Sequence, residues 1–167
     1  AIDNLQTTIT SLYLLGARNF LLPNLPDLGL TPEARQYGDA AMFGGTLLSQ
    51  SFNAALDQLY GTLPLYMPEA HLVTFNAMAV QRDITNNPGG YGMTDVKTPC
   101  FEGGVGLPGA KCDAPSSFLY WDTVHPTTAA HEILGRQMAA AVPEPGTFLM
   151  MALGGLALLG WQRRRAG

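Results

Sequence analysis

Asp122 and His125, two residues capable of acid–base chemistry, lie three positions apart in Tyr120-Trp121-Asp122-Thr123-Val124-His125-Pro126. Histidine is the natural general base because its pKa lies near neutral pH, and a nearby carboxylate can fix its tautomer and stabilise the imidazolium. Pro126 restricts His125 to extended backbone, so the imidazole is expected on a loop before a helix. The pair could serve acyl transfer through a hydroxyl nucleophile. The alternative is a surface Asp beside a His that caps the following helix.

Short apolar runs that alternate with helical patterns predict the scaffold for this pair. Strands are predicted at residues 20–22 and 71–75, and helices at residues 3–15, 43–60, 77–84 and 127–141. Residues 86–117, rich in Gly and Pro, are predicted to be a long irregular segment that borders a functional site. This order predicts an α/β fold with a parallel sheet and helices on both faces. Because two strands make a poor sheet, further strands are expected upstream of residue 1.

Composition excludes several classes of protein. The chain has 167 residues, of which 47% are hydrophobic and 13% are charged. It is therefore long and apolar enough for one folded domain. Net charge is −4 and there is no basic patch with interleaved aromatic residues, so nucleic-acid binding is not expected. The three histidines lack the Cys or carboxylate spacing of a metal site. Neither a metal nor a cofactor is therefore expected.

Cys100 and Cys112 lie in the Gly/Pro-rich segment. If the protein is exported, a disulfide that closes a short surface loop is the better interpretation. Two unpaired loop thiols remain the alternative until the compartment is known.

The sequence around Asp122 and His125 closely resembles the last conserved block of the GDSL (SGNH) esterase and lipase family. The matching segments are Trp121-Asp122-x-x-His125-Pro126-Thr127 followed by Ala130-His131, and residues 14–26 and 87–94. The resemblance covers roughly residues 1–141. It implies the C-terminal part of a three-layer α/β/α SGNH-hydrolase (flavodoxin-like) fold with a parallel sheet. It also implies that His125 is the catalytic base and Asp122 the acid that orients it.

No segment of this chain matches the nucleophile that His125 should serve. The family carries its Ser in a Gly-Asp-Ser-Leu motif and an oxyanion-hole Asn in Gly-x-Asn-Asp, and both motifs are absent. Gly38-Asp39-Ala40 lacks the Ser and is interpreted as a chance similarity. A nucleophile-elbow context is also missing around four serines: Ser49, Ser51, Ser116 and Ser117. Residues 1–141 are therefore predicted to be a partial domain, and the chain, which opens in a helix without Met, the C-terminal piece of a longer protein.

The C-terminal tail carries three ordered elements. Pro143-Glu144-Pro145 precedes an uncharged run over residues 147–161, and Arg163-Arg164-Arg165 follows. Together residues 142–167 resemble the PEP-CTERM sorting signal of Gram-negative bacteria that produce exopolysaccharide. The resemblance implies recognition by an exosortase, transient anchoring of a C-terminal hydrophobic helix in the inner membrane, and cleavage near Pro-Glu-Pro. The mature protein would then reach the cell surface or the extracellular space.

These observations predict an exported serine ester hydrolase of the lipase or acylesterase type. This chain would contribute Asp122 and His125 to a Ser-His-Asp site. Its partners would be an ester substrate (a lipid, an acyl ester or an acetylated carbohydrate), an exosortase and the inner membrane. The alternative is a non-catalytic surface or biofilm-associated protein that retains the SGNH fold.

Overall fold

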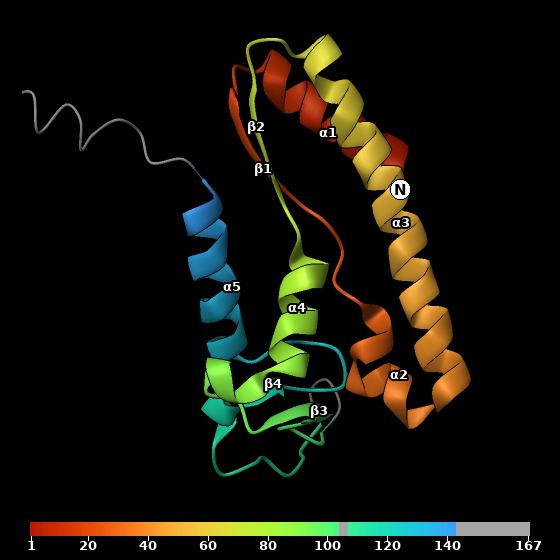
Figure 1. The fold of residues 1–167 in the computed structure, drawn as a ribbon, viewed down its shortest axis with the longest axis vertical. Helices are drawn as coiled ribbons and strands as arrows, with labels where there is room; N and C mark the ends of the chain where they lie inside the picture. The colour runs from red at the N-terminus through yellow and green to blue at the C-terminus, as the bar shows by residue number, and fades with distance from the viewer. Residues whose placement is uncertain (104–106, 143–167) are drawn as a thin grey trace, which may run out of the picture.

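A computed structural model describes residues 1–103 and 107–142 of the chain. These residues form helices and short parallel strands, so the α/β class predicted from the sequence is confirmed. Figure 1 shows β1 (Asn19–Pro23) and β2 (His71–Phe75) in one half of the molecule and β3 (Asp95–Pro99) and β4 (Phe118–Tyr120) at the opposite end, with α4 (Ala77–Asn86) between them. The two strands predicted at residues 20–22 and 71–75 pair in one parallel sheet, and a second two-stranded parallel sheet, which the sequence did not predict, lies in the other half of the described residues.

The first half of the structure is built on β1 (Asn19–Pro23), which pairs in parallel with β2 (His71–Phe75) from Asn19↔His71 to Pro23↔Phe75. Two helices, α1 (Ile2–Leu14) and α3 (Asp39–Tyr66), belong to the same half. Their shared core is a buried cluster of five residues: Ile9, Leu22, Leu59, Leu63 and Met67. Of the apolar stripe predicted on the first helix, only Ile9 is buried, while Leu5 and Leu12 are exposed.

Helix α3 is longer at both ends than predicted, and Gly61 does not end it. Leu59 and Leu63 are four residues apart and both buried, so they pack into the core from the same face of the helix. This packing outweighs the cost of about 1 kcal/mol that a helical glycine carries relative to alanine. Gly38 precedes the helix with a positive φ, in the left-handed region that favours glycine. Gly38-Asp39-Ala40 is thus the start of a helix.

The second half contains two strands in or beside the segment predicted to be irregular. β3 (Asp95–Pro99) pairs in parallel with β4 (Phe118–Tyr120), and short 3₁₀ turns lie at Pro88–Tyr91 and Pro115–Ser117. Two helices, α4 (Ala77–Asn86) and α5 (Thr128–Ala141), pack with them. The core here is a second cluster: Ile84, Met93, Val96, Leu119, Tyr120 and Ala130. Periodicity missed β3 because Val96 is its one fully buried residue, and β4 because it has only three residues.

The connection from β1 to α3 lies tightly against α3. It contains the 3₁₀ turn η1 (Leu28–Leu30) and the short helix α2 (Pro32–Gln36). A Cβ on Gly29 would lie 2.1 Å from the carbonyl oxygen of Met42, and one on Gly45 would lie 2.8 Å from the amide nitrogen of Gly29. Glycine at these two positions therefore permits a backbone-to-backbone approach that no side chain would allow.

The sorting elements predicted in the tail, Pro143, Glu144, Pro145 and the apolar run at 147–161, lie outside the described residues. Among the residues that the structure describes, no helix combines the length and apolar character needed to cross a bilayer.

Cys100 and Cys112 form a disulfide, with 4.9 Å between their Cα atoms. The bond closes a hairpin-like loop in which Phe101 and Lys111 pair as an antiparallel bridge. The amide of Cys112 also donates to the carbonyl oxygen of Cys100 at 2.7 Å. The loop is therefore held by main-chain hydrogen bonds as well as by the covalent bond.

Reduction of this disulfide should lower the free energy of unfolding by about 3 kcal/mol, the chain-entropy estimate for a loop of roughly this size. Urea unfolding of residues 1–167 with and without reductant measures the effect. The Cys100→Ser/Cys112→Ser variant is the control, because its stability should not respond to reductant. Labelling of two thiols per chain in native, exported protein would contradict the bond.

Candidate active site

The segment that carries Asp122 and His125 is a tight turn between β4 and α5. The amide of Trp121 donates to the carbonyl oxygen of His125 at 2.7 Å, and Tyr120 and Pro126 pair as an isolated antiparallel bridge. Thr127 then fixes the start of α5. Its hydroxyl accepts from the amide of Ala130 at 3.2 Å and donates to the carbonyl oxygen of Phe118 at 2.7 Å. The end of the strand and the start of the helix are thereby tied to each other.

Asp122 and His125 are in direct contact. The Oδ2 and Oδ1 atoms of Asp122 lie 2.8 and 3.1 Å from Nδ1 of His125. Oδ1 also accepts from the amides of Val124 at 2.9 Å and His125 at 2.6 Å. One carboxylate thus holds both the backbone of the turn and the imidazole ring. Nδ1 is engaged, and no described residue forms a hydrogen bond with Nε2.

The environment of Asp122 favours the charged carboxylate. Partial burial by itself would raise the pKa of Asp122. The backbone N–H donors of His125 and Val124, together with the hydrogen bond and charge of the imidazole, outweigh burial and lower the pKa below its usual value. Asp122 is therefore ionised at neutral pH and can stabilise a positive charge on the imidazole ring.

The structure places the cap of α5 on Thr127, so His125 is not a helix-capping residue. His131 makes a local contact, with Nδ1 3.0 Å from the carbonyl oxygen of Thr127. His71 begins β2. Within residues 1–103 and 107–142, no group of three or more His, Cys, Asp or Glu residues is arranged to hold a metal ion.

His125 lies on the wall of a cavity of about 410 Å³. Its lining comes from the end of β1 and from α4, β4 and α5, and most of the lining residues are apolar, among them Ile84, Leu119, Leu134 and Met138. The imidazole itself is open to solvent, with 72% of its side chain exposed, while Asp122 is 26% exposed. The pair therefore combines a partly buried carboxylate, an exposed imidazole and an adjacent apolar cavity.

On the other side of the turn, Trp121 stacks on Phe101 with ring centroids 5.5 Å apart and an interplanar angle of 9°. The amide of Phe101 donates to the carbonyl oxygen of Trp121 at 2.6 Å. Trp121, Ser116 and Glu132 line a second cavity of about 450 Å³. The disulfide-closed loop is thus packed against the residue that immediately precedes Asp122.

None of the described serines is hydrogen-bonded to His125. Ser49 is fully buried in α3, where its hydroxyl donates to the carbonyl oxygen of Gly45 and accepts from the amide of Leu28. Ser51 is exposed on the same helix, and Ser117 donates to the carbonyl oxygen of Ala114. Ser116 lines the second cavity. The structure therefore brings acid and base together without a nucleophile among the described serines.

Sequence reasoning missed one residue behind the turn, Gln81, which is 8% exposed and bonded to the hydroxyl of Tyr120 at 2.7 Å. The sequence did contain a pattern that indicates Gln81. Gln81 lies four residues after Ala77 and three before Ile84, so it falls on the buried stripe of α4. A polar side chain on such a stripe needs a buried partner.

Comparison with known proteins identifies the family of this chain. The family model described as GDSL-like Lipase/Acylhydrolase matches residues 1–138, and the chain belongs to that family. A second model, the PEP-CTERM protein-sorting motif, matches residues 141–165.

Curated relatives carry related names. The GDSL esterase/lipase APG of Arabidopsis thaliana is 30% identical over 151 residues, which cover 80% of this chain and 41% of the relative. The anther-specific proline-rich protein APG of Brassica napus is 27% identical over 145 residues, covering 81% of this chain and 32% of the relative. The chain therefore spans about two fifths or less of these relatives' length.

The lowered pKa of Asp122 predicts the direction in which the free energy of unfolding changes at acid pH. A carboxylate with a depressed folded-state pKa stabilises the fold above its unfolded pKa of about 3.9, and this contribution is lost as pH falls through the folded pKa. Asp122→Asn should therefore weaken the dependence of stability on pH below about pH 4. Urea unfolding of residues 1–167 across this range measures it, with the exposed Asp113→Asn as the matched control. Equal acid profiles for Asp122→Asn and wild type would contradict the assignment.

Proposed function

We propose that this chain is the acid–base part of a serine ester hydrolase. The observation that carries the proposal is the bond between Asp122 and Nδ1 of His125, which leaves Nε2 for a nucleophile. In this mechanism Nε2 accepts the proton of a serine hydroxyl as the oxygen attacks the ester carbonyl carbon. The same proton then passes to the leaving alcohol, and water completes hydrolysis of the acyl-enzyme. Asp122 keeps the tautomer and stabilises the imidazolium throughout.

The serine and the oxyanion-hole donors, in this proposal, come from a segment upstream of residue 1. Three features support an incomplete site. The imidazole of His125 is largely exposed, so it lacks the water exclusion that strengthens electrostatics in active sites. Among the described strands, β1 pairs only with β2, which leaves its other edge open. The apolar cavity beside His125 also offers a surface that buried strands would cover. The upstream segment would pair with β1, fill part of this cavity and bring its serine to Nε2.

Export is the second part of the proposal. The match of residues 141–165 to the PEP-CTERM motif supports recognition by an exosortase in a Gram-negative bacterium. Residues 142–167 would form the sorting unit, anchored transiently in the inner membrane by the apolar run and retained by the arginines on the cytoplasmic side. The hydrolase would then act at the cell surface or outside the cell. An ester of a lipid, another acyl ester or an acetylated carbohydrate remains the substrate class, and no cofactor is required.

The absence of a nucleophile bonded to His125 within the described residues favours a second candidate, a non-catalytic surface protein that retains the fold. The upstream sequence distinguishes the two. A Gly-Asp-Ser motif behind a signal peptide supports the enzyme, whereas an upstream segment without that serine supports the binding protein.

In the protein that includes the upstream segment, His125→Ala should lower kcat on short p-nitrophenyl esters by about 10³-fold or more, because little beyond binding and oxyanion stabilisation remains. Asp122→Asn should cause a comparable or slightly smaller loss through the wrong tautomer. His131→Ala is the matched control, since that imidazole bonds only within its own helix and cap in the structure.

Residues 1–167 alone should show no turnover above background. Turnover by this chain that disappears in Ser116→Ala or Ser117→Ala would place the nucleophile here instead. Near-normal kcat in His125→Ala would remove the pair from the mechanism.

Processing of the tail gives a separate prediction. Mature protein from the native host should end near Pro145, because sorting is proposed to proceed by cleavage at the Pro-Glu-Pro motif. Intact-mass measurement on cell-surface and secreted fractions decides the outcome, with a Pro143→Ala/Glu144→Ala/Pro145→Ala variant as the uncleaved control. Mature exported protein that retains Arg163-Arg164-Arg165 would make the tail a plain membrane anchor.

A further inference from the structure

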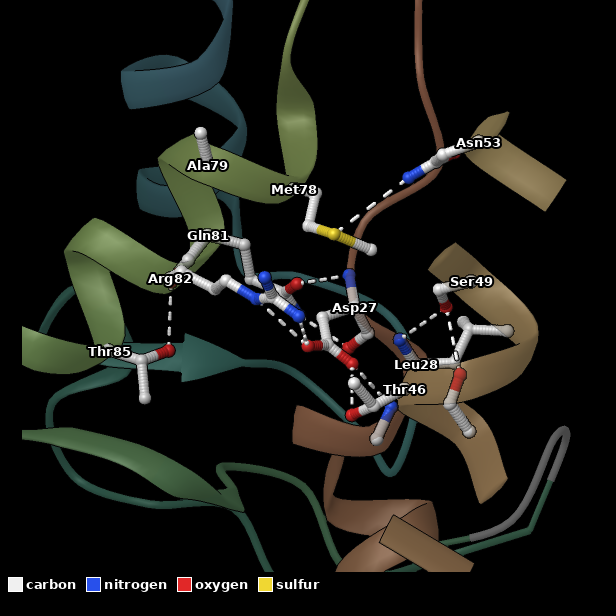
Figure 2. A network of polar contacts seen from close by, with 12 residues as sticks. Asp27, Leu28, Thr46, Ser49, Asn53, Met78, Ala79, Gln81, Arg82 and Thr85 are labelled. Atoms are coloured by element: carbon white, nitrogen blue, oxygen red, sulfur yellow. Dashed lines mark hydrogen bonds and ion pairs between the residues drawn. The ribbon is translucent and has the colours of Figure 1, made fainter. Parts of the chain in front are cut away.

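The carboxylate of Asp27, between β1 and η1, is almost completely buried, with the residue 2% exposed. Figure 2 shows its partners, which come from two helices and from its own loop. Arg82 on α4 donates to Oδ2 through Nε at 3.0 Å and through Nη2 at 2.6 Å. The hydroxyl of Thr46 on α3 and the amide of Gly29 donate to Oδ1 at 2.7 and 3.0 Å. Asp27 is the buried partner, because its side chain is 3% exposed and that of Arg82 is 39% exposed. Arrangements that leave the buried Asp27 charge unpaired are strongly penalised.

The main chain of Asp27 is held just as closely by Gln81. The amide of Asp27 donates to Oε1 of Gln81 at 2.5 Å, and Nε2 of Gln81 donates to the carbonyl oxygen of Asp27 at 3.2 Å. The same Nε2 donates to the hydroxyl of Tyr120 at 2.7 Å. Gln81 and Tyr120 are both buried, so these bonds lie out of water. The amide of Gln81 therefore couples the Asp27 loop to the last residue of β4.

Tyr120 stands two residues before Asp122, where the turn begins. Its carbonyl oxygen accepts from the amide of Cys100 at 3.0 Å, so its ring and its backbone are both fixed. The loop that contains Asp27 touches the turn a second time. It leads into α2, and the amide of Glu33 in the first turn of that helix donates to the carbonyl oxygen of Thr123 at 2.8 Å. The turn is thus held both at its start and between Asp122 and His125.

We infer that Gln81, fixed by Asp27 and Arg82, is a positioning residue for the turn that carries Asp122 and His125. It sets the location of Tyr120 from inside the core, and Tyr120 sets where the turn leaves β4. Its catalytic meaning rests on the proposed ester hydrolase function, because the direction in which Nε2 of His125 is presented matters only if a nucleophile must meet it. Gln81 and Tyr120 also line the cavity that His125 borders. The positioning contact therefore borders the same cavity as His125.

Backbone amide hydrogen exchange, measured by NMR on residues 1–167, tests the inference without requiring activity. The amides of Trp121, Val124 and His125 report on the turn, since each is bonded within it. In Gln81→Leu and in Tyr120→Phe these amides should exchange about tenfold faster or more, while amides in the middle of α3 keep their rates. Tyr120→Phe removes only the hydroxyl and keeps the ring, so it gives the same comparison if Gln81→Leu fails to fold.

Thr85→Ala is the matched control, because the Thr85 hydroxyl bonds to the carbonyl oxygen of Gln81 at 2.8 Å on the same helix. It should leave exchange in the turn unchanged. Unchanged exchange in Gln81→Leu and Tyr120→Phe would overturn the inference. An equal increase in exchange rate throughout the molecule would also overturn it, because the network would then stabilise the core as a whole and not the turn in particular.

In the protein that includes the upstream segment, the same two variants should lower kcat about tenfold and leave KM within about twofold, whereas Thr85→Ala changes neither. Faster exchange in the turn with unchanged kcat would overturn the positioning role. If wild-type protein hydrolyses no ester, the proposed function fails, and the exchange rates still decide whether Gln81 holds the turn.

Discussion

The ion pair between the buried Asp27 and the partly exposed Arg82 is the constraint on which the described structure most depends. The two hydrophobic clusters lie in different halves of the molecule, and the two small sheets share no strand. Asp27 joins the halves because its partners Thr46 and Arg82 belong to α3 in the first half and α4 in the second. A carboxylate removed from water needs its donors in place, so the loop that carries it can adopt few other positions. This polar network therefore fixes the position of one half relative to the other, which two separate apolar cores cannot do alone.

The same constraint explains how a short turn can hold a defined geometry. Asp122 organises the turn from within, through two backbone amides and the imidazole. Thr127 and Tyr120 anchor its ends to β4 and to the core. The internal bonds join residues at most four positions apart, whereas the anchors at Tyr120 and Glu33 depend on residues from distant elements. The local motif therefore fixes the distance between acid and base, and the fold fixes where the pair points.

The same difference between local bonds and contacts with distant elements determines what could be predicted from the sequence. The contact between Asp122 and His125 was accessible because it spans three residues. The helices around Leu59 and Ala130 were accessible because their apolar spacing is periodic. The continuation of α3 past Gly61 depends on Leu63 finding a core that local propensity does not describe. β3 and the Gln81–Tyr120 bond depend on contacts across 23 and 39 positions, which no local pattern contains.

The disulfide links the candidate site to the proposed destination of the protein. Cys100 is buried and its amide donates to the carbonyl oxygen of Tyr120, so the bond is anchored where the turn begins. The neighbouring Phe101 stacks on Trp121, the residue next to Asp122. Disulfides persist in oxidising compartments and are rare in the reducing cytosol. Transport beyond the inner membrane is proposed from the PEP-CTERM match. It would carry the domain to an oxidising environment, in which the disulfide next to the turn persists. The proposed sorting signal and the disulfide beside the Asp122–His125 turn would thus be consistent with one destination, an oxidising compartment outside the cytosol.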